Sequence, residues 1–242
     1  MIEHHIDLQT ADGLMNTFIT HPEEGGPFPV IFFYMDAPGK REELHDMARR
    51  FATAGYYVIL PNLYYRVTRE FELNFGSVSS RMRMRELMNN LGNNMVVRDT
   101  QTLLVYVDND PAAQSDRIGC VGYCMSGPFS YSVAGAYPDR ISAAASIYGV
   151  YLITDRKDSP HLNTDKIKAE LYFACAQSDD YAPDEMVDKL EQYLKDHHHN
   201  FRLDRYPDTF HGFAFPNRAM YNKHAAEQHW ERLHALFTRN LK

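Results

Sequence analysis

Apolar residues follow two different spacings along this chain, and the two spacings alternate. Short continuous apolar runs are typical of strands that are covered on both faces of a sheet. Such runs occupy residues 29–34, 56–61, 117–123, 143–149 and 169–176. Most segments between them have apolar residues three and four positions apart, which predicts helices with one buried face. The alternation of strands and helices predicts a mostly parallel sheet with helices on both faces.

The remaining segments complete the predicted α/β fold. Two β-like runs, residues 3–10 and 14–21, are joined by a turn signal at Ala11-Asp12-Gly13, and a further strand is expected at 201–206. The sheet should therefore contain about eight strands. Helices are predicted at residues 41–53, 79–107 with an interruption at Gly92, 126–136, 184–195 and 217–239. Ligands of such sheets bind at the carboxyl ends of the strands, so candidate site residues should follow directly after strands.

Length and composition narrow the class of protein. A chain of 242 residues with 44% hydrophobic residues can bury a large core, and it fits one α/β domain over residues 1–242 better than two small ones. The net charge of -7 argues against nucleic acid or an anionic membrane as the main partner. We find no signal peptide and no apolar run long enough to span a bilayer. We therefore expect a cytoplasmic protein, a monomer or small homo-oligomer, that acts on a small molecule.

The three cysteines are too few for a disulfide framework in so long a chain. Their odd number leaves at least one thiol free, which favours a reducing compartment. Cys120 and Cys175 lie inside apolar runs, so both are expected to pack in the core. Cys120 and Cys124 do not make a zinc site, because further cysteines or a nearby histidine pair are missing. We expect no metal and no other cofactor.

Cys124 stands where a strand ends, in the segment Gly122-Tyr123-Cys124-Met125-Ser126-Gly127. A nucleophile elbow needs a strand, a tight turn with the nucleophile at its apex, and a helix, with small residues two positions before and after the apex. Gly122 and Ser126 occupy those two positions here, although glycine is usual at the second. A buried structural thiol is the common role of a cysteine. The register of strand, turn and helix instead favours Cys124 as a nucleophile.

A nucleophile of this kind needs a base and a group that orients the base. In this arrangement the acid and then the histidine follow the nucleophile along the chain. Asp179 and Asp180 lie in the turn after the strand at 169–176, and His211 follows the last strand. Both turns lie where the argument requires them.

The other histidines have simpler interpretations. The run at 197–199 ends a helix, where the helix dipole and solvent favour histidine without any metal. His224, His229 and His234 belong to the last predicted helix and are expected to face solvent or to pack.

The motifs GYCMSG, DDYAP and TFHGF together resemble the dienelactone hydrolase family of α/β-hydrolases, which uses cysteine in place of serine. The resemblance extends to PVIFFYMDAPG and YYVILPNLYYR, and so over nearly the whole chain. It implies the α/β-hydrolase fold, with Cys124 as the nucleophile and His211 as the general base. Asp179 matches the family's acid because Pro183 lies four residues after it, and Asp180 is the alternative.

The resemblance also implies residues that stabilise the reaction. The backbone N–H groups of Ala37 and Met125 match the two donors of the oxyanion hole. Family members carry a glutamate beside the first of these donors, and it contacts the cysteine. This chain has Asp36 there, which is one methylene shorter and is a candidate partner of the thiol.

Substrate binding is where the resemblance is weaker. The family's dienelactone enzymes hold the substrate carboxylate with two arginines, and Arg81 matches the first, with Arg83 and Arg85 as alternatives. Arg66, beside Tyr64 and Tyr65, is a candidate to line the pocket. At the second position, four residues after the histidine, this chain has Phe215, so an apolar ring replaces a charged clamp. Tyr64, with its neighbour Tyr65, is expected either to line the pocket or to pack.

These residues predict a carboxylic ester hydrolase of the carboxymethylenebutenolidase type, which cleaves small esters or lactones through a Cys-His-Asp triad and a thioester acyl-enzyme. The dienelactone specificity does not follow, because Phe215 replaces an arginine. A carboxylesterase or thioesterase with a larger apolar acyl pocket is the alternative among enzymes. A non-catalytic α/β-hydrolase that binds a ligand or partner is the alternative outside them, and the complete set of reacting residues argues against it.

Overall fold

The apolar runs of the sequence form the strands of one twisted sheet. The computed structural model describes residues 1–198 and 200–242, so His199 of the histidine run lies outside the described residues. Within them the sheet has eight strands in the order β1-β2-β4-β3-β5-β6-β7-β8. The strands are β1 (Ile2–Thr10), β2 (Gly13–His21), β3 (Phe28–Tyr34), β4 (Tyr57–Pro61), β5 (Ala113–Tyr123), β6 (Ile141–Ile147), β7 (Glu170–Ser178) and β8 (Phe201–Phe210).

The predicted mostly parallel arrangement is confirmed. The hairpin β1–β2 is antiparallel, as is the pairing of β2 with β4. The strands from β4 through β3 to β8 are all parallel to their neighbours. Their carboxyl ends therefore meet at one edge of the sheet, which is the edge expected to hold a site.

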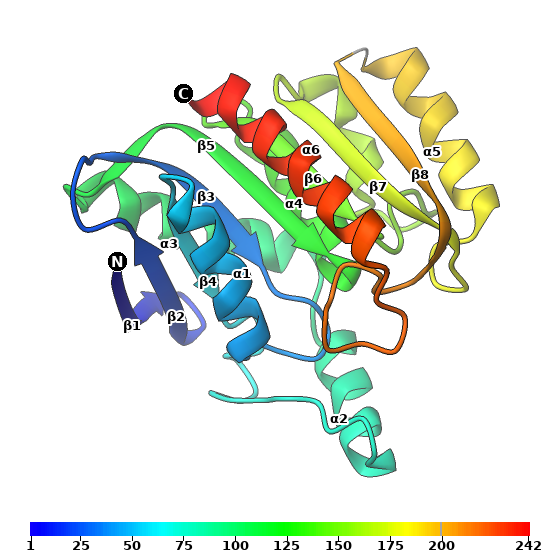
Figure 1. The fold of residues 1–242 in the computed structure, drawn as a ribbon, viewed down its shortest axis with the longest axis horizontal. Coiled ribbons are helices and arrows are strands. Elements are labelled where there is room, and N and C mark those ends of the chain that lie inside the picture. Colours follow the sequence, from blue (N-terminus) through cyan, green and yellow to red (C-terminus); the bar gives the residue numbers. More distant parts are fainter. Residues whose placement is uncertain (199) are drawn as a thin grey trace.

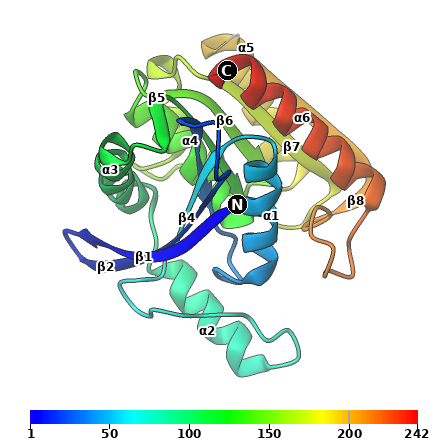
Figure 2. The same cartoon turned by 60° about the vertical axis from the view of Figure 1, so that its left-hand side comes forward.

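Helices cover both faces of this sheet, as Figure 1 shows. The helices are α1 (Glu42–Thr53), α2 (Val78–Asn89), α3 (Asn93–Asn109), α4 (Gly127–Ala136), α5 (Asp184–His197) and α6 (Lys223–Leu241). In the turned view of Figure 2, α3 lies on one side of the sheet, and α1 and α6 lie on the other. The helix α1 buries the face that the sequence predicted, since Leu44, Ala48 and Phe51 are fully buried. None of the helices in the described part of the chain is long and apolar enough to cross a membrane.

The start of the last helix differs from the sequence prediction. The last helix begins at Lys223 rather than at 217, and residues 211–222 form a loop. Pro216 disfavours a helical conformation of the preceding residue. Asn222 supplies the start signal, because its side-chain oxygen accepts a hydrogen bond from the N–H of Ala225 at 3.2 Å. The predicted interruption at Gly92 is confirmed, since it separates α2 from α3.

The helix α2 projects from the body of the molecule, below the sheet in the views of Figures 1 and 2. Leu87 is its one buried side chain. Phe75 precedes the helix, and Val78 and Met82 lie on it, and all three are more than half exposed. The contact between α2 and the rest of the protein is therefore slight compared with that of the other helices.

Candidate active site

The chain makes a strained turn at Cys124, directly after β5. Cys124 has φ +56°, a left-handed conformation that L-residues rarely adopt outside tight turns. The turn brings the carbonyl oxygen of Ser126 to within 1.9 Å of where a side chain on Gly122 would begin. A Cβ on Gly127 would meet the backbone of Gly149 at 2.4 Å. Glycine at 122 and 127 is thus a steric requirement of the turn that presents the thiol.

Ser126 has a reason to replace the usual glycine of such a turn. It is fully buried, and its hydroxyl donates a hydrogen bond to the carbonyl oxygen of Met35 at 2.5 Å. Met35 lies just after β3, so this bond joins the cysteine turn to the loop of the neighbouring strand. The small polar side chain fixes the two loops relative to one another.

His211 and Asp179 lie beside this turn, on the loops after β8 and β7. The imidazole Nδ1 lies 2.7 Å from Oδ2 of Asp179, whose side chain is 1% exposed. The other carboxylate oxygen accepts hydrogen bonds from the backbone N–H groups of Tyr181 and Ala182. Asp180 is exposed instead. The structure therefore brings Asp179, and not Asp180, to the histidine.

The surroundings of His211 favour its charged form. Burial lowers the pKa of His211, but the hydrogen bond to Asp179, followed by that to the thiol of Cys124, raises it more. The net effect raises the pKa of His211 to about 10. Since Nδ1 faces Asp179, Nε2 is the nitrogen left to face the thiol of Cys124.

The predicted oxyanion donors lie on the two loops that Ser126 joins. Ala37 and Met125 are both buried. Within the described residues, neither N–H donates to a backbone carbonyl outside the regular elements. Tyr64 lies between the two donors, because its hydroxyl donates to the carbonyl oxygen of Ala37 at 2.8 Å and lies 3.4 Å from Sδ of Met125. Tyr64 is buried and acts as a strut between these loops rather than as an open pocket wall.

Asp36 is held by two arginines. Its carboxylate accepts hydrogen bonds from Arg41 at 2.5 Å and from Arg218 at 3.1 Å. Arg41 also binds Glu43, so a network of alternating charges links the loop after β3 to the start of α1. Sequence reasoning missed both arginines. A buried carboxylate is stable only with a cationic partner. Its partner Arg218 lies 182 positions further along the chain, and no spacing rule identifies it.

Phe215 does not face a substrate, contrary to the sequence expectation. It is 1% exposed and packs against Tyr123 and Tyr148. The guanidinium of Arg218 lies 5.5 Å from the centre of its ring. Arg218, three residues after Phe215 in the same loop, extends to Asp36, whereas the Phe215 ring stays in the core. Both residues belong to the loop at 211–222, of which only residues 217–222 had been predicted as helix.

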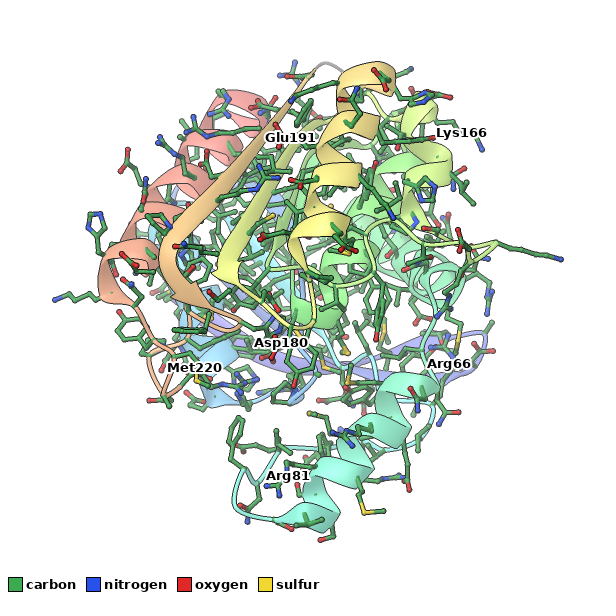
Figure 3. The ribbon with its side chains drawn as sticks, turned by 90° about the vertical axis from the view of Figure 1, so that its right-hand side faces the viewer. Arg66, Arg81, Lys166, Asp180, Glu191 and Met220 are labelled. Carbon is green, nitrogen blue, oxygen red and sulfur yellow. The ribbon has the colours of Figure 1, made fainter. Side chains whose placement is uncertain are left out.

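The arginines of α2 are exposed. Arg81 donates to the carbonyl oxygen of Phe75 and Arg83 pairs with Glu86. Figure 3 shows Arg81 on the projecting helix, with Asp180 and Met220 on the part of the body that faces it. Arg66 lies well to the other side, where it binds Asp99. Arg81 thus lies on the exposed helix α2, while Arg66 is bound elsewhere.

Cys120, Cys175 and His229 are buried in the core. Burial raises the pKa of Cys120 and raises that of Cys175 to about 12. His229 is fully buried and accepts a hydrogen bond from the hydroxyl of Tyr123 at 3.1 Å. In the part of the chain that the structure describes, no three histidine, cysteine or acidic side chains gather as metal ligands.

The hollows on the described surface include one beside the candidate site. A hollow of about 510 Å³ borders Asp179 and is also lined by Asp184 and Phe210. Another, of about 500 Å³, is lined by residues that include His5 and Lys40 and by none of the three reacting groups. We place the candidate site by the thiol, imidazole and carboxylate rather than by cavity size.

Known proteins with this sequence pattern and fold are numerous. The dienelactone hydrolase family matches residues 15–241 of this chain. A carboxymethylenebutenolidase homologue from Synechocystis sp. is 28% identical over 93% of this chain and 92% of its own. Another, from Escherichia coli, is 25% identical over 90% of this chain and 80% of its own. A dienelactone hydrolase homologue from Klebsiella pneumoniae has the same fold, with a TM-score of 0.87, 22% identity and 98% coverage of both chains.

Proposed function

This chain belongs to the dienelactone hydrolase family, and from that premise we propose that it is a carboxylic ester hydrolase acting on small esters or lactones. Cys124 is the nucleophile, His211 the general base and acid, and Asp179 the group that orients the histidine. The N–H groups of Ala37 and Met125 form the oxyanion hole. The observation that carries the proposal is the Asp179–His211 hydrogen bond beside a cysteine at φ +56°, with the thiol of Cys124 among the groups that raise the pKa of His211.

The reaction follows from these positions. The sulfur of Cys124 attacks the ester carbonyl carbon while His211 holds the thiol proton, and the carbonyl oxygen becomes an oxyanion. Two preset N–H donors stabilise that charge, and losing one such donor costs about 3 to 4 kcal/mol in other enzymes. The C–O bond then breaks, His211 gives its proton to the departing alkoxide, and a thioester remains. Water, deprotonated by His211, hydrolyses the thioester and restores the thiol.

The guanidinium of Arg218 supports substrates that carry a carboxylate. Its side chain is 19% exposed, so it is not wholly enclosed, and one of its nitrogens already binds Asp36. A substrate carboxylate would compete with Asp36 for this guanidinium. Charge-assisted hydrogen bonds of this kind contribute about 1.5 to 3 kcal/mol each.

The exposed apolar side chains near α2 favour a second candidate, a carboxylesterase with an apolar acyl group. Phe75, Val78 and Met82 offer apolar surface on and just before α2, and the guanidinium of Arg218 lies 4.3 Å from the centre of the Phe75 ring. An apolar acyl chain would bury that surface, whereas a small lactone would leave it in water. Chain-length series of p-nitrophenyl esters separate the two candidates, because the second predicts rates that rise from acetate to hexanoate.

The direct test is turnover of p-nitrophenyl acetate by the native protein and its cysteine variants. Cys124→Ala should abolish turnover with the fold intact. Iodoacetamide should modify Cys124 alone, as read by mass spectrometry, because Cys120 and Cys175 are buried. Cys175→Ala is the matched control and should keep most activity. Turnover that survives Cys124→Ala, or that is lost in Cys175→Ala while the protein remains folded, would reject the proposal.

A further inference from the structure

Two tyrosine rings contact the imidazole of His211. Tyr148 follows β6 and is buried, with its ring centre 5.0 Å from that of His211. Tyr181 lies in the turn after β7, with a ring-centre distance of 4.9 Å, and its side chain is 66% exposed. One ring therefore supports the histidine from the core, and the other extends from it into solvent.

The exposed ring is held in place by its backbone. The N–H of Tyr181 donates to Oδ1 of Asp179 at 2.9 Å, so the turn that fixes the acid also fixes this tyrosine. A large aromatic ring that is two-thirds exposed and anchored beside a reactive group offers apolar surface to a ligand. The hollow next to the same turn is lined by another exposed aromatic, Phe210.

The proposed reaction determines which part of the substrate lies beside Tyr181. In the proposed acylation step, Cys124 forms the S–C bond, the C–O bond breaks, and His211 gives its proton to the leaving oxygen. That oxygen must lie within hydrogen-bond distance of the imidazole when the bond breaks. The group carried by the leaving oxygen therefore extends from a point beside His211, where the Tyr181 ring is the exposed neighbour.

The geometry points to Tyr181 as the residue that selects the leaving group, with a preference for esters of aromatic or bulky apolar alcohols. This inference rests on the proposed function, since it assigns a part of the substrate to the acylation step. The acyl group itself lies on the other side of the scissile bond and is not affected. Tyr181 contacts the substrate only until the alcohol departs.

The test compares benzyl acetate with methyl acetate. Their alcohols have similar acidity, and both esters give the same acetyl-enzyme, so deacylation is common to the pair. Tyr181→Ala should lower kcat/KM for benzyl acetate about 10-fold, the scale of one lost aromatic contact. It should leave methyl acetate within twofold, and it should leave the hydrolysis rate of the acetyl-enzyme unchanged. Tyr181→Phe should retain the preference, because the ring and not the hydroxyl makes the contact.

Tyr151→Ala is the matched control, because Tyr151 is 62% exposed and also follows a strand. It should change neither ester. Equal losses for both esters, or slower hydrolysis of the acetyl-enzyme in Tyr181→Ala, would mean that Tyr181 positions His211, and would overturn the inference. Failure of the proposed function would give a different result. The native protein would then hydrolyse neither ester, or would hydrolyse them no faster than the Cys124→Ala variant.

Discussion

Asp179 and Asp180 are neighbours of identical chemistry, but the turn after β7 directs one of them to the histidine and the other to solvent. Asp179→Asn should lower the pKa of His211 from about 10, because the largest effect that raises it is the hydrogen bond that the imidazole donates to this carboxylate. Ester turnover should fall strongly in the same variant, since the amide no longer selects the productive tautomer. Titration of the histidine by NMR measures the first effect.

Asp180→Asn is the internal control for that experiment. It keeps the turn and changes only an exposed side chain, so both the titration and the turnover should match the native protein. The opposite result, a shifted titration in Asp180→Asn and none in Asp179→Asn, would move the acid by one residue.

Arg218 sets the expected response to substrate charge. Arg218→Met should reduce the preference for a carboxylated lactone over its methyl ester by roughly 10- to 150-fold, the equivalent of one charge-assisted hydrogen bond. The measurement is the ratio of kcat/KM for the two substrates. Arg83→Met is a suitable control, because Arg83 is exposed and pairs with Glu86. An unchanged ratio in Arg218→Met would assign the carboxylate to another cation, with Arg81 as the first to test.

Among individual site residues, the sequence could predict those that directly follow a strand, but not those placed by loops. Cys124, Asp179 and His211 each follow a parallel strand, so the topology alone brings them to one edge. Arg218 and Phe215 depend on the path of a loop and on the reach of long side chains. Neither is encoded in a local pattern, which is why the expected exchange of an arginine for Phe215 did not describe the site.

Among the elements, the turn between β5 and α4 tolerates the least change. Gly122→Ala places a methyl group 1.9 Å from the carbonyl oxygen of Ser126, so the turn must open. We expect a loss of more than about 2 kcal/mol in the free energy of unfolding and the loss of ester turnover. Urea unfolding and turnover of p-nitrophenyl acetate measure the two effects.

Gly76→Ala is the corresponding control, because its nearest neighbour, Oδ1 of Asn74, lies 3.4 Å away at ordinary contact distance. It should change stability by no more than about 0.5 kcal/mol. A Gly122→Ala protein with native stability and activity would show that the turn is not as tightly constrained as its backbone indicates.

The elements themselves were largely predictable, because buried parallel strands and one-sided helices leave strong periodic patterns. The eight strands and the break at Gly92 follow from those patterns. The start of the last helix did not, because residues 217–222 belong to the loop at 211–222. There Pro216 and the cap at Asn222 override periodicity.

The whole molecule should be most stable near pH 6.5, where two histidines have opposite effects. The pKa of His211 is raised from 6.5 to about 10. Between these two pH values the native state binds more protons than the unfolded chain, so the free energy of unfolding falls as the pH rises. Burial is the main cause that lowers the pKa of His229 to about 3. The native state there binds fewer protons than the unfolded chain, so stability falls as the pH decreases from about 6.5 towards 3.

Urea unfolding across pH 4 to 9.5 tests this balance. His211→Asn should flatten the alkaline side and His229→Gln the acidic side, while His224→Asn, an exposed control on α6, should alter neither slope. An alkaline slope that persists in His211→Asn would assign it to other groups.

The slight attachment of α2 has a consequence for how this protein could diversify. Leu87 is the one buried side chain among its 12 residues, and Phe75, just before the helix, contacts Arg218. Substitutions along it therefore place few folding contacts at risk, whereas those in the cysteine turn place many. Related proteins could therefore acquire new substrates through changes in α2 while the cysteine turn and the sheet stay the same.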